Sequence, residues 1–552
     1  MTTTDTENQV AKASVGPAKS MKAGSKVRVK GLINKSEYNG KIGTLIKFNA
    51  EKGRWGVDMG EGNGSLLVKP EHLDVEIDGK FPELSGYEQY HQANAKPCAW
   101  STESAAHRWA QRLNSNDPKF KSLCILRPFP EQDQRILFEA LENTTVLEEL
   151  FINRKALCDA GLKCLNKALL KNKSLKLIQM GGEWFTDREL EMICSGIQAS
   201  VLERIDFGLS AFEGAGLTSL ARALQNRVTK AVETDDNQHV SVLKSLNLRD
   251  SITSEGVKSD ADREGIRMLC ELLPNCACEK IDLSGIELTA EDARNLGKWV
   301  GSDHAKEVVL QNCGLDNSRL GELLHSGIAP GLEVLRLDEN SFGDSSDSGD
   351  VNGDSDCGFE ILWRELRNAS SLTELSLTKC DIVHPRKLLE AICADGFAAG
   401  GDGAFVNLRD NKFGNVVNEC FDMMVGENKR LPRGLDLSNC GLNSANTMGS
   451  LRHSKDLKQL VLQANDGAGL RSFCQLPAEE IGFASLQELD LANNSLSEDD
   501  TYTIVKSLLD DRNRFPSLQV LVLGGNDIDS ARMGVCEECT ETRGLRVIWE
   551  QN

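Results

Sequence analysis

The sequence lacks any long hydrophobic run. No stretch of about 18 apolar residues, the shortest that indicates a membrane span, occurs in the 552-residue chain. The first residues also lack the apolar segment of a secretory signal, and Asp5 and Glu7 disfavour an organellar transit peptide. We therefore expect no membrane association, and we expect residues 1–23 to form a disordered arm.

The sequence also lacks the common motifs of enzymes. It contains no G-x-x-x-x-G-K-[ST] phosphate loop, no G-x-G-x-x-G after a strand, no G-x-S-x-G turn and no H-E-x-x-H motif, and its 8 histidines form no cluster. The one C-x-x-C pair, Cys536 and Cys539, has no second pair at zinc-site spacing, and the two glutamates between the thiols raise their pKa. We therefore predict a protein without enzymatic activity, metal or cofactor.

Disulfides are not expected either. The 17 cysteines are scattered along a long chain without a secretory signal, whereas disulfide frameworks are typical of short secreted chains. This pattern indicates free thiols in a reducing compartment, the cytosol or the nucleus.

Positive charge is scarce after the first 80 residues. The net charge is −20, although residues 1–80 have a small excess of Lys and Arg over Asp and Glu. The acidic remainder repels phosphate backbones, so nucleic-acid binding is disfavoured. A basic or mixed-charge protein partner suits this field better.

What the sequence has in abundance is a leucine repeat, apolar-x-x-Leu-x-Leu. Its first position falls at Phe120, Leu147, Leu175, Leu202, Leu243, Cys278, Ala305, Leu332, Leu372, Gly403, Pro432, Leu457, Leu486, Leu518 and Leu545. The commonest interval is 27–28 residues. Each unit continues with an Asn or Cys and then a helical apolar pattern, as in residues 161–169 and 217–224. Such a unit cannot bury its apolar face alone, so a stack of strand-turn-helix units is expected.

The tetrapeptide Asn-Cys-Gly-Leu occurs twice, at residues 312–315 and 439–442, each time after a strand pattern. We predict that the buried thiols of Cys313, Cys380 and Cys440 take the place that Asn340 and Asn494 fill in other units. A free cysteine behaves as a small hydrophobic residue with a weak hydrogen-bond donor, so no chemistry is expected of these thiols.

Residues 147–172 (LEELFINRKALCDAGLKCLNKALLKN), residues 486–509 (LQELDLANNSLSEDDTYTIVKSLL) and the two NCGL units carry a family resemblance. They resemble the ribonuclease-inhibitor-like leucine-rich repeats of ribonuclease inhibitors, Ran GTPase-activating proteins and nucleotide-binding immune receptors. The resemblance implies an α/β leucine-rich-repeat solenoid, a horseshoe of about fifteen strand-helix repeats over residues 120–552. The implied functions are a non-enzymatic protein-binding scaffold, a GTPase-activating protein of the Ran-activator type, or a ribonuclease inhibitor.

Some segments depart from the pattern. Gly403 and Pro432 occupy first template positions, so we expect an irregular stack near 396–435. Insertions occur at 226–241, 253–265 and 343–358, and the last two project from one edge of the solenoid, which often marks a binding side.

The insertion at 343–358 contains Asp-Val-Asn-Gly-Asp-Ser-Asp, which resembles part of a calcium loop. Counted from Asp350, the sixth position is Ser355 instead of Gly, and the twelfth is Ile361 instead of Glu. We expect a solvated acidic loop rather than a cation site.

Residues 24–76 have a different texture, with short alternating runs between Gly-rich turns. We expect about five strands in a small all-β barrel. The YNGKIG turn, the GRW-V strand and the VKPEHL ending resemble SH3-like barrel modules. Tyr38, Phe48 and Trp55 are the candidates for an aromatic peptide groove. At least one aromatic is expected to fill the core of so small a barrel, and for Trp55 a core position is favoured over ligand contact. Residues 77–119 are interpreted as a linker with a helix at 104–113 that caps the first repeat.

The residue between the last two template leucines points away from the core onto the concave face. From this column and the next exposed one we predict a protein-binding surface formed by Phe151, Asp206, Arg249, Asp282, Arg336, Asp338, Asn407, Arg409, Asp436, Asp490 and Trp549. Phe151 and Trp549 are the expected apolar anchors, and the charges set orientation. The sequence does not indicate an oligomeric state.

Overall fold

The computed structural model divides the chain into one unit within residues 1–104 and a second unit within residues 105–552. The described residues are 21–30, 32, 38, 41–49, 52–60, 65–76, 105–182, 185–233, 243–252, 263–342, 358–382, 385–528 and 534–549. Most of the predicted arm, most of the predicted linker and much of the three predicted insertions lie outside these residues.

The first unit is a five-stranded antiparallel sheet in the order β4-β3-β2-β1-β5. Its elements are β1 (Lys26–Val29), β2 (Ile42–Asn49), β3 (Arg54–Asp58), β4 (Ser65–Val68), the 3₁₀ turn η2 (Pro70–His72) and β5 (Leu73–Val75). Alternate residues such as Val27, Leu45 and Val57 are buried in its core. A Cβ at Gly43 would lie 2.6 Å from the Asp58 carbonyl oxygen, so glycine permits this close approach of two strands. The sheet fits the small barrel that the sequence predicts.

The second unit contains a parallel sheet of fifteen strands that lie side by side in chain order. The strands are β6 (Ser122–Ile125), β7 (Glu149–Ile152), β8 (Leu177–Gln179), β9 (Arg204–Asp206), β10 (Ser245–Asn247), β11 (Lys280–Asp282), β12 (Glu307–Val309), β13 (Val334–Arg336), β14 (Glu374–Ser376), β15 (Phe405–Asn407), β16 (Gly434–Asp436), β17 (Gln459–Val461), β18 (Glu488–Asp490), β19 (Val520–Val522) and β20 (Arg546–Ile548). The predicted α/β solenoid of about fifteen repeats is confirmed.

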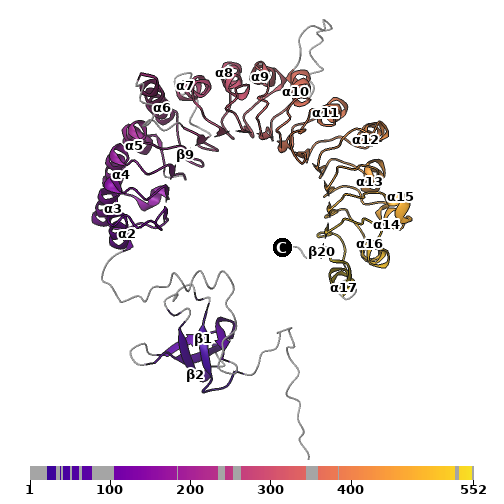
Figure 1. Cartoon of the computed structure of the whole chain (residues 1–552), viewed down its shortest axis with the longest axis horizontal. Coiled ribbons are helices and arrows are strands. Elements are labelled where there is room, and N and C mark those ends of the chain that lie inside the picture. Colours follow the sequence, from indigo (N-terminus) through magenta and orange to yellow (C-terminus); the bar gives the residue numbers. More distant parts are fainter. Residues whose placement is uncertain are drawn as a thin grey trace, which may run out of the picture. The chain divides into compact units, whose positions relative to one another are not determined.

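A row of helices covers the outer side of this sheet, and the strands line the inner side of the arc (Figure 1). The helices are α2 (Ala105–Asn114), α3 (Glu131–Asn143), α4 (Asp159–Lys171), α5 (Asp187–Ala199), α6 (Ala215–Glu233), α7 (Glu264–Leu272), α8 (Ala290–Val300), α9 (Asn317–Leu324), α10 (Gly358–Leu366), α11 (Pro385–Ile392), α12 (Val416–Gly426), α13 (Ser444–Leu451), α14 (Leu470–Cys474), α15 (Ala478–Ile481), α16 (Glu498–Asp510) and α17 (Gly534–Arg543), with 3₁₀ turns η3 (Arg154–Ala156) and η4 (Leu273–Asn275). No helix among the described residues is long and apolar enough to cross a membrane.

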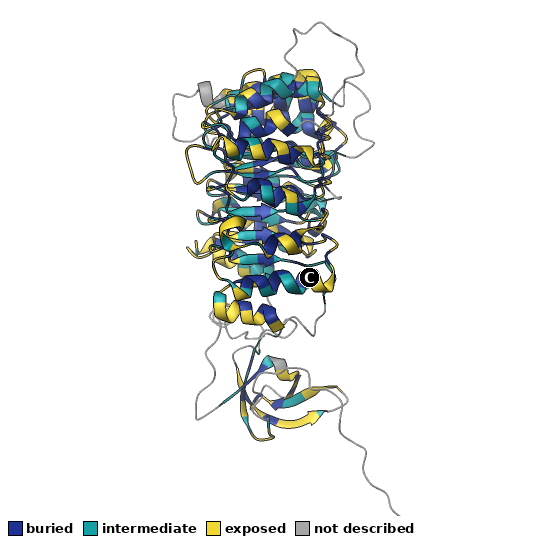
Figure 2. Ribbon diagram, turned by 90° about the vertical axis from the view of Figure 1, so that its right-hand side faces the viewer, coloured by how far each residue is buried: buried dark blue, intermediate teal, exposed yellow. Residues whose placement is uncertain are grey.

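One continuous hydrophobic core fills the space between the strands and the helices (Figure 2). The template leucines supply most of it, as Leu246 and Leu248 do in the repeat of β10, both fully buried. Larger side chains fill wider gaps, and the buried Trp299 indole N–H donates to the Cys278 carbonyl at 2.9 Å. Each repeat therefore buries its apolar residues only by contact with its neighbours.

A buried asparagine joins each of several repeats to the preceding one. The Asn340 Oδ1 atom accepts the N–H groups of Cys313 and Leu315 at 3.0 Å each, and its Nδ2 donates to the carbonyls of Leu310 and Leu337 at 2.8 Å each. The same four-bond pattern is made by Asn411, Asn465 and Asn526. These side chains satisfy the backbone groups that the turn after each strand leaves free.

Cysteines occupy the corresponding position in the repeats of β12, β14 and β16, as the sequence predicts. The thiols of Cys313, Cys380 and Cys440 are fully buried, and each donates to a carbonyl of the preceding repeat at 3.3 Å. Burial raises the pKa of Cys313 and of Cys440 to about 12. A thiolate is therefore disfavoured at these positions, which agrees with a packing role.

The residue three positions after each strand adopts the left-handed conformation in eleven consecutive repeats, with φ from 48° to 76°. These residues are Leu209, Asp250, Gly285, Asn312, Glu339, Lys379, Asp410, Asn439, Ala464, Asn493 and Gly525. Gly, Asn and Asp adopt this conformation at low cost. Their frequency at this position explains the Asn-rich and Gly-rich segments that follow the strands in the sequence.

One local expectation was wrong. The stack is regular near 396–435, because β15 and β16 pair in register with each other and with β14 and β17. The helix α6 continues to Glu233 and so includes the first part of the insertion 226–241.

Candidate functional site

The strand register brings one residue of each repeat into a single column on the concave side of the solenoid. Asp206 of β9 pairs with Asn247 of β10, which pairs with Asp282 of β11, and the same register continues to Val522 of β19. From β11 the column runs through Val309, Arg336, Ser376, Asn407, Asp436, Val461, Asp490 and Val522. Most of the residues predicted for the binding surface lie in this column or two positions later.

The acidic and amide side chains of the column hold the turns that follow them. Asp206, Asp282, Asp436 and Asp490 each accept the backbone N–H two residues later, at 2.8–3.1 Å. Asn247 and Asn407 do the same for Arg249 and Arg409, at 2.9 and 3.1 Å. These side chains therefore support the turn after the strand.

Two carboxylates of the column are held in surroundings that disfavour their charge. Burial is the main cause that raises the pKa of Asp206, and the charge of Asp282 adds to it. Burial likewise raises the pKa of Asp490, and the negative charges of Asp436 and Glu488 add repulsion. A cationic group on a ligand would relieve this repulsion, which makes the acidic column suited to basic side chains.

At the centre of the column, charged groups are paired across neighbouring strands. The Arg336 guanidinium donates to both carboxylate oxygens of Glu374, at 2.6 and 2.9 Å. Asp338 accepts the Ser376 hydroxyl at 2.5 Å and the Thr378 N–H at 2.7 Å. These contacts fix the side chains in place, so this part of the surface is preorganised.

Two arginines, Arg249 and Arg409, each reach across one neighbouring strand to a glutamine that follows the next strand. The Arg249 Nη2 atom lies 3.4 Å from Gln311 Oε1, and its Nε lies 3.3 Å from Asp250 Oδ2. The first contact crosses β11, because Arg249 follows β10 and Gln311 follows β12. We call this arrangement the first arginine bridge.

The second arginine bridge is formed five strands later. The Arg409 Nη1 atom lies 3.2 Å from Gln463 Oε1, and its Nε lies 3.4 Å from Asp410 Oδ2. At about 4.8 Å per strand, the two bridges are about 24 Å apart along the sheet. Both arginine side chains are about half exposed, so both present a guanidinium group to the concave side.

The sequence contains the signal for this duplication, although the leucine template alone did not reveal it. Residues 247–250 and 407–410 both read Asn-Leu-Arg-Asp. Asp-Leu-Ser follows one repeat later at 282–284 and 436–438, and Val-Leu-Gln follows at 309–311 and 461–463. A search for similarity between units five repeats apart identifies both bridges.

The two expected apolar anchors lie in different surroundings. Phe151 is in the column, opposite Cys124 of β6 and Gln179 of β8. Trp549 is not in the column, because Ile548 pairs with Val522 and Trp549 follows one residue later and packs against the hydrophobic core. Placing Trp549 on the concave face was therefore wrong.

An alternating charge ladder runs along the opposite edge of the strands. It consists of Lys121, Glu148, Lys176, Glu203, Lys244, Glu279, Lys306 and Glu333, in which each backbone N–H donates to the carbonyl of the residue before it in the ladder. Lys244 and Glu203 lie 2.8 Å apart, and Lys306 and Glu279 lie 3.3 Å apart. Opposite charges therefore face each other along eight repeats, a feature that the sequence interpretation missed.

The barrel brings together two of its three predicted groove residues. The rings of Phe48 and Trp55 are 5.4 Å apart, on paired residues of β2 and β3. Trp55 and Tyr38 both pack partly against the barrel core, and the Lys41 ammonium lies 5.2 Å from the Tyr38 ring centre. Phe48 is the most exposed of the three, at 40%.

Among the residues that the structure describes, no group of three or more His, Cys, Asp or Glu side chains has the spacing to hold a metal ion. Cys536 and Cys539 are both buried in α17, and burial raises the pKa of Cys536 to about 12. These thiols are poor candidates for redox chemistry, because the reactive species is the thiolate.

The sequence and the structure were compared with those of known proteins. No protein-family model matches the sequence. The mouse ribonuclease inhibitor is 24% identical over 259 residues, which cover 45% of this chain and 49% of that protein. The chain carries ribonuclease-inhibitor-like leucine-rich repeats.

Two further proteins resemble the leucine-rich repeat solenoid. The bovine NACHT, LRR and PYD domains-containing protein 5 is 23% identical over 238 residues, which cover 42% of this chain and 19% of that protein. A crystal structure of a TLR13–ssRNA13 complex covers 76% of this chain and 60% of that chain, with a TM-score of 0.34 and 14% identity. The chain spans about half the length of the mouse relative and less of the bovine one.

Proposed function

We propose that the chain is a non-enzymatic scaffold that holds a protein ligand on the concave face of its leucine-rich repeats. The ligand contacts the repeats between β10 and β17, where the two arginine bridges lie. Its surface carries mixed charge, with acidic groups opposite Arg249 and Arg409 and basic groups opposite the acidic column. The barrel binds a peptide separately, with Phe48 and Trp55 as contacts.

The observation that carries this proposal is the pair of matched arginine bridges. Arginine presents a planar set of donors that suits carboxylates, and partly buried arginines are frequent energetic centres of protein interfaces. Each guanidinium is already positioned by a Gln and an Asp, so little side-chain entropy is lost on binding. The convex side of these repeats is covered by helices, which leaves the sheet face for a large partner.

The test uses the double substitution Arg249→Ala and Arg409→Ala. Its matched control is Arg294→Ala with Arg386→Ala, which removes two exposed arginines that pair with Glu322 and Glu390 on the outer helices. Proteins captured from a native extract are quantified by mass spectrometry for the unchanged chain and both variants, after circular dichroism has established folding.

We expect a partner that is retained by the control and reduced at least tenfold by the concave variant, which corresponds to about 1.4 kcal/mol or more. Equal recovery of every partner by the two variants would exclude the arginine bridges as binding elements.

Ribonuclease inhibition is a second candidate, supported by the mouse relative and by the five acidic residues of the predicted surface. A basic ribonuclease complements these carboxylates. The test is a ribonuclease inhibition curve with a pancreatic-type enzyme. Saturating inhibition that weakens when Asp206 and Asp490 are changed to Asn supports this candidate. The absence of inhibition at a micromolar concentration of the protein rules it out.

A further inference from the structure

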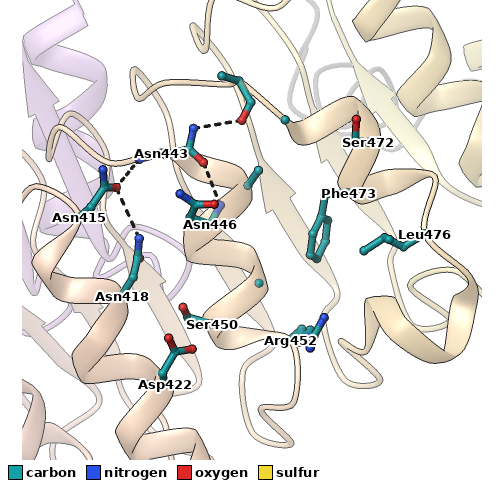
Figure 3. Close-up of a pocket in the computed structure, with 14 residues that line it drawn as sticks. Asn415, Asn418, Asp422, Asn443, Asn446, Ser450, Arg452, Ser472, Phe473 and Leu476 are labelled. Carbon is teal, nitrogen blue, oxygen red and sulfur yellow. Dashed lines mark hydrogen bonds between the residues drawn. The ribbon is translucent and has the colours of Figure 1, made fainter.

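A groove of about 960 Å³ lies on the outer helical row, over α13 (Figure 3). It exists because α13 carries small side chains on its outward side, Ala445, Asn446 and Gly449. The walls are supplied by residues before and within α12 on one side and by the segment 468–476 on the other. The groove is open to solvent and is not an enclosed pocket.

The groove walls are held rigid by asparagine side chains. Asn443 accepts the Asn446 N–H at 2.9 Å, and its Nδ2 donates to Asp466 and to the Ala468 carbonyl at 3.1 and 3.0 Å. Asn415 accepts the Asn443 N–H at 3.0 Å. The two walls and α13 are therefore linked to each other before any ligand arrives.

Two polar side chains that line the groove have hydrogen-bonding capacity left for a ligand. Ser450 is 9% exposed, and its hydroxyl makes no hydrogen bond within the described part of the chain. Asn418 is 8% exposed; its Oδ1 accepts the Thr447 hydroxyl at 2.9 Å, and its Nδ2 reaches Asn415 Oδ1 at 3.5 Å. A ligand with backbone-like donors and acceptors can bond the Ser450 hydroxyl and the Asn418 Nδ2 group.

The groove combines charged and apolar groups. Figure 3 shows Asp422 on α12, Ser450 and Arg452 at the end of α13, and Phe473 and Leu476 on the opposite wall. Asp422 is exposed, and no cationic side chain lies within ion-pair distance of it in the described part of the chain. A ligand with a positive charge near Asp422 and an apolar side chain toward Phe473 would complement these two groups.

We propose that this groove binds an extended peptide segment of a partner protein. The peptide backbone pairs with Ser450 and Asn418, a Lys or Arg of the peptide lies at Asp422, and an apolar side chain packs against Phe473 and Leu476. A purely apolar ligand would leave the amide and hydroxyl groups unpaired. The groove lies on the helical side of the sheet, so it is separate from the concave surface.

The experiment fills the groove at Gly449. A Cβ at this position meets no atom within 4 Å, so both Gly449→Trp and Gly449→Ala are compatible with the helix. The probe is a phage-displayed library of random linear peptides, selected against the full chain with Phe48→Ala, which removes the exposed aromatic contact proposed for the barrel. Selected peptides are then synthesised, and their affinity for the unchanged chain and both variants is measured by calorimetry.

We expect peptides with a basic residue near an apolar one, at least tenfold weaker binding to Gly449→Trp, and unchanged binding to Gly449→Ala. Asp422→Lys is the second variant, and it should weaken basic peptides at least tenfold without filling the groove. The double variant Arg249→Ala with Arg409→Ala should leave peptide binding unchanged, because it acts on the other face. Peptides that bind all of these variants equally, or a library without any enriched peptide, would overturn the proposal.

Discussion

At the scale of single residues, the turn after each strand depends on one buried side chain. An asparagine satisfies four backbone groups of two repeats, whereas a cysteine in the repeats of β12, β14 and β16 donates one weak hydrogen bond. Both fit because the position is small and enclosed. The asparagine carries more of the energy, since each of its four bonds replaces water at a buried backbone group.

Asn411 is the position where this difference can be measured. We expect Asn411→Ala to lower the free energy of unfolding by about 3 kcal/mol or more, because it leaves four buried backbone groups without partners. Asn411→Cys should cost less, because its thiol can donate to the Leu377 carbonyl as Cys380 does to Leu337. Urea denaturation followed by circular dichroism gives the free energies. Equal losses in the two variants would contradict this account of the turn.

Two aspartates in similar turns predict opposite responses to pH. Asp490 and Asp466 each accept the N–H two residues later, at 2.8 and 3.0 Å. Burial raises the pKa of Asp490, whereas the Ala468 N–H and then Asn443 lower the pKa of Asp466. The charge of Asp490 therefore costs stability as the pH rises above its unfolded pKa, about 3.9, while the stability from Asp466 is lost as the pH falls below that value.

We accordingly expect Asp490→Asn to raise the Tm at neutral pH and Asp466→Asn to lower it. Both differences should shrink as the pH falls below about 3.9, the unfolded pKa, and the one at Asp466 should persist to lower pH because its folded pKa is lowered. Each Asn can still accept the N–H of its turn, whereas Asp466→Asn also removes the oxygen that accepts from Asn443 Nδ2. Thermal unfolding at several pH values checks this, and shifts of the same sign in both variants would refute it.

At the scale of strands and helices, the template leucines predicted the strands because their spacing records which side chains must enter the core. The register that the leucine template predicts for the last strand, β20, differs from the observed one by one residue, and the reason is physical. Residues 545–549 are apolar at four of five positions, so the pattern allows two registers one residue apart. Gly544, with φ of 72°, ends α17 and lets the strand begin earlier than the leucine suggests.

Other features could not be predicted from the leucine pattern, because each depends on contacts between residues of several repeats. The groove over α13 requires small outward residues on one helix and walls from its two neighbours. The arginine bridges require contacts across an intervening strand. The charge ladder joins residues that are 27 or more positions apart, and only the shared strand register makes them neighbours.

The charge ladder gives the prediction at this scale. In Glu279→Lys, three lysines occupy successive positions at 244, 279 and 306, each about 4.8 Å from the next. Like charges directly opposite each other are unfavourable, so we expect a loss of about 1 kcal/mol at low ionic strength. The loss should shrink as salt is added.

Glu279→Gln is the matched control, because it removes the attraction without adding repulsion. It should cost less than Glu279→Lys and should respond less to salt. Urea unfolding of both variants at low and high sodium chloride measures the difference. A loss that does not depend on salt would show that Glu279 acts by packing instead of charge.

At the scale of the whole molecule, the two units have separate hydrophobic cores, one in the barrel and one along the solenoid. The solenoid core begins at α2, whose Ala106, Ala110 and Leu113 are buried. The terminal unit of such an array needs a cover, because its apolar face has no further repeat to contact. The boundary of the independently folding part therefore lies before α2, at about residue 105.

Two shortened chains test this boundary, residues 105–552 and residues 117–552. We expect the first to have the same Tm as the solenoid transition of the full chain, because its core is complete. The second loses α2 together with Asn116, whose Oδ1 accepts the Thr145 N–H at 2.8 Å. Burial of one leucine side chain alone contributes about 1.5–3 kcal/mol, so the repeats at β6 and α3 should open more often.

Hydrogen exchange measured by mass spectrometry locates the effect. Peptides from residues 120–145 should exchange at least tenfold faster in the chain 117–552 than in the chain 105–552, while peptides from β14 to β18 exchange at the same rate in both. This local response is expected because each repeat contacts only its neighbours. A uniform increase along the solenoid would mean that the array unfolds as one unit, and a lower Tm of the chain 105–552 would mean that the first 104 residues stabilise the repeats.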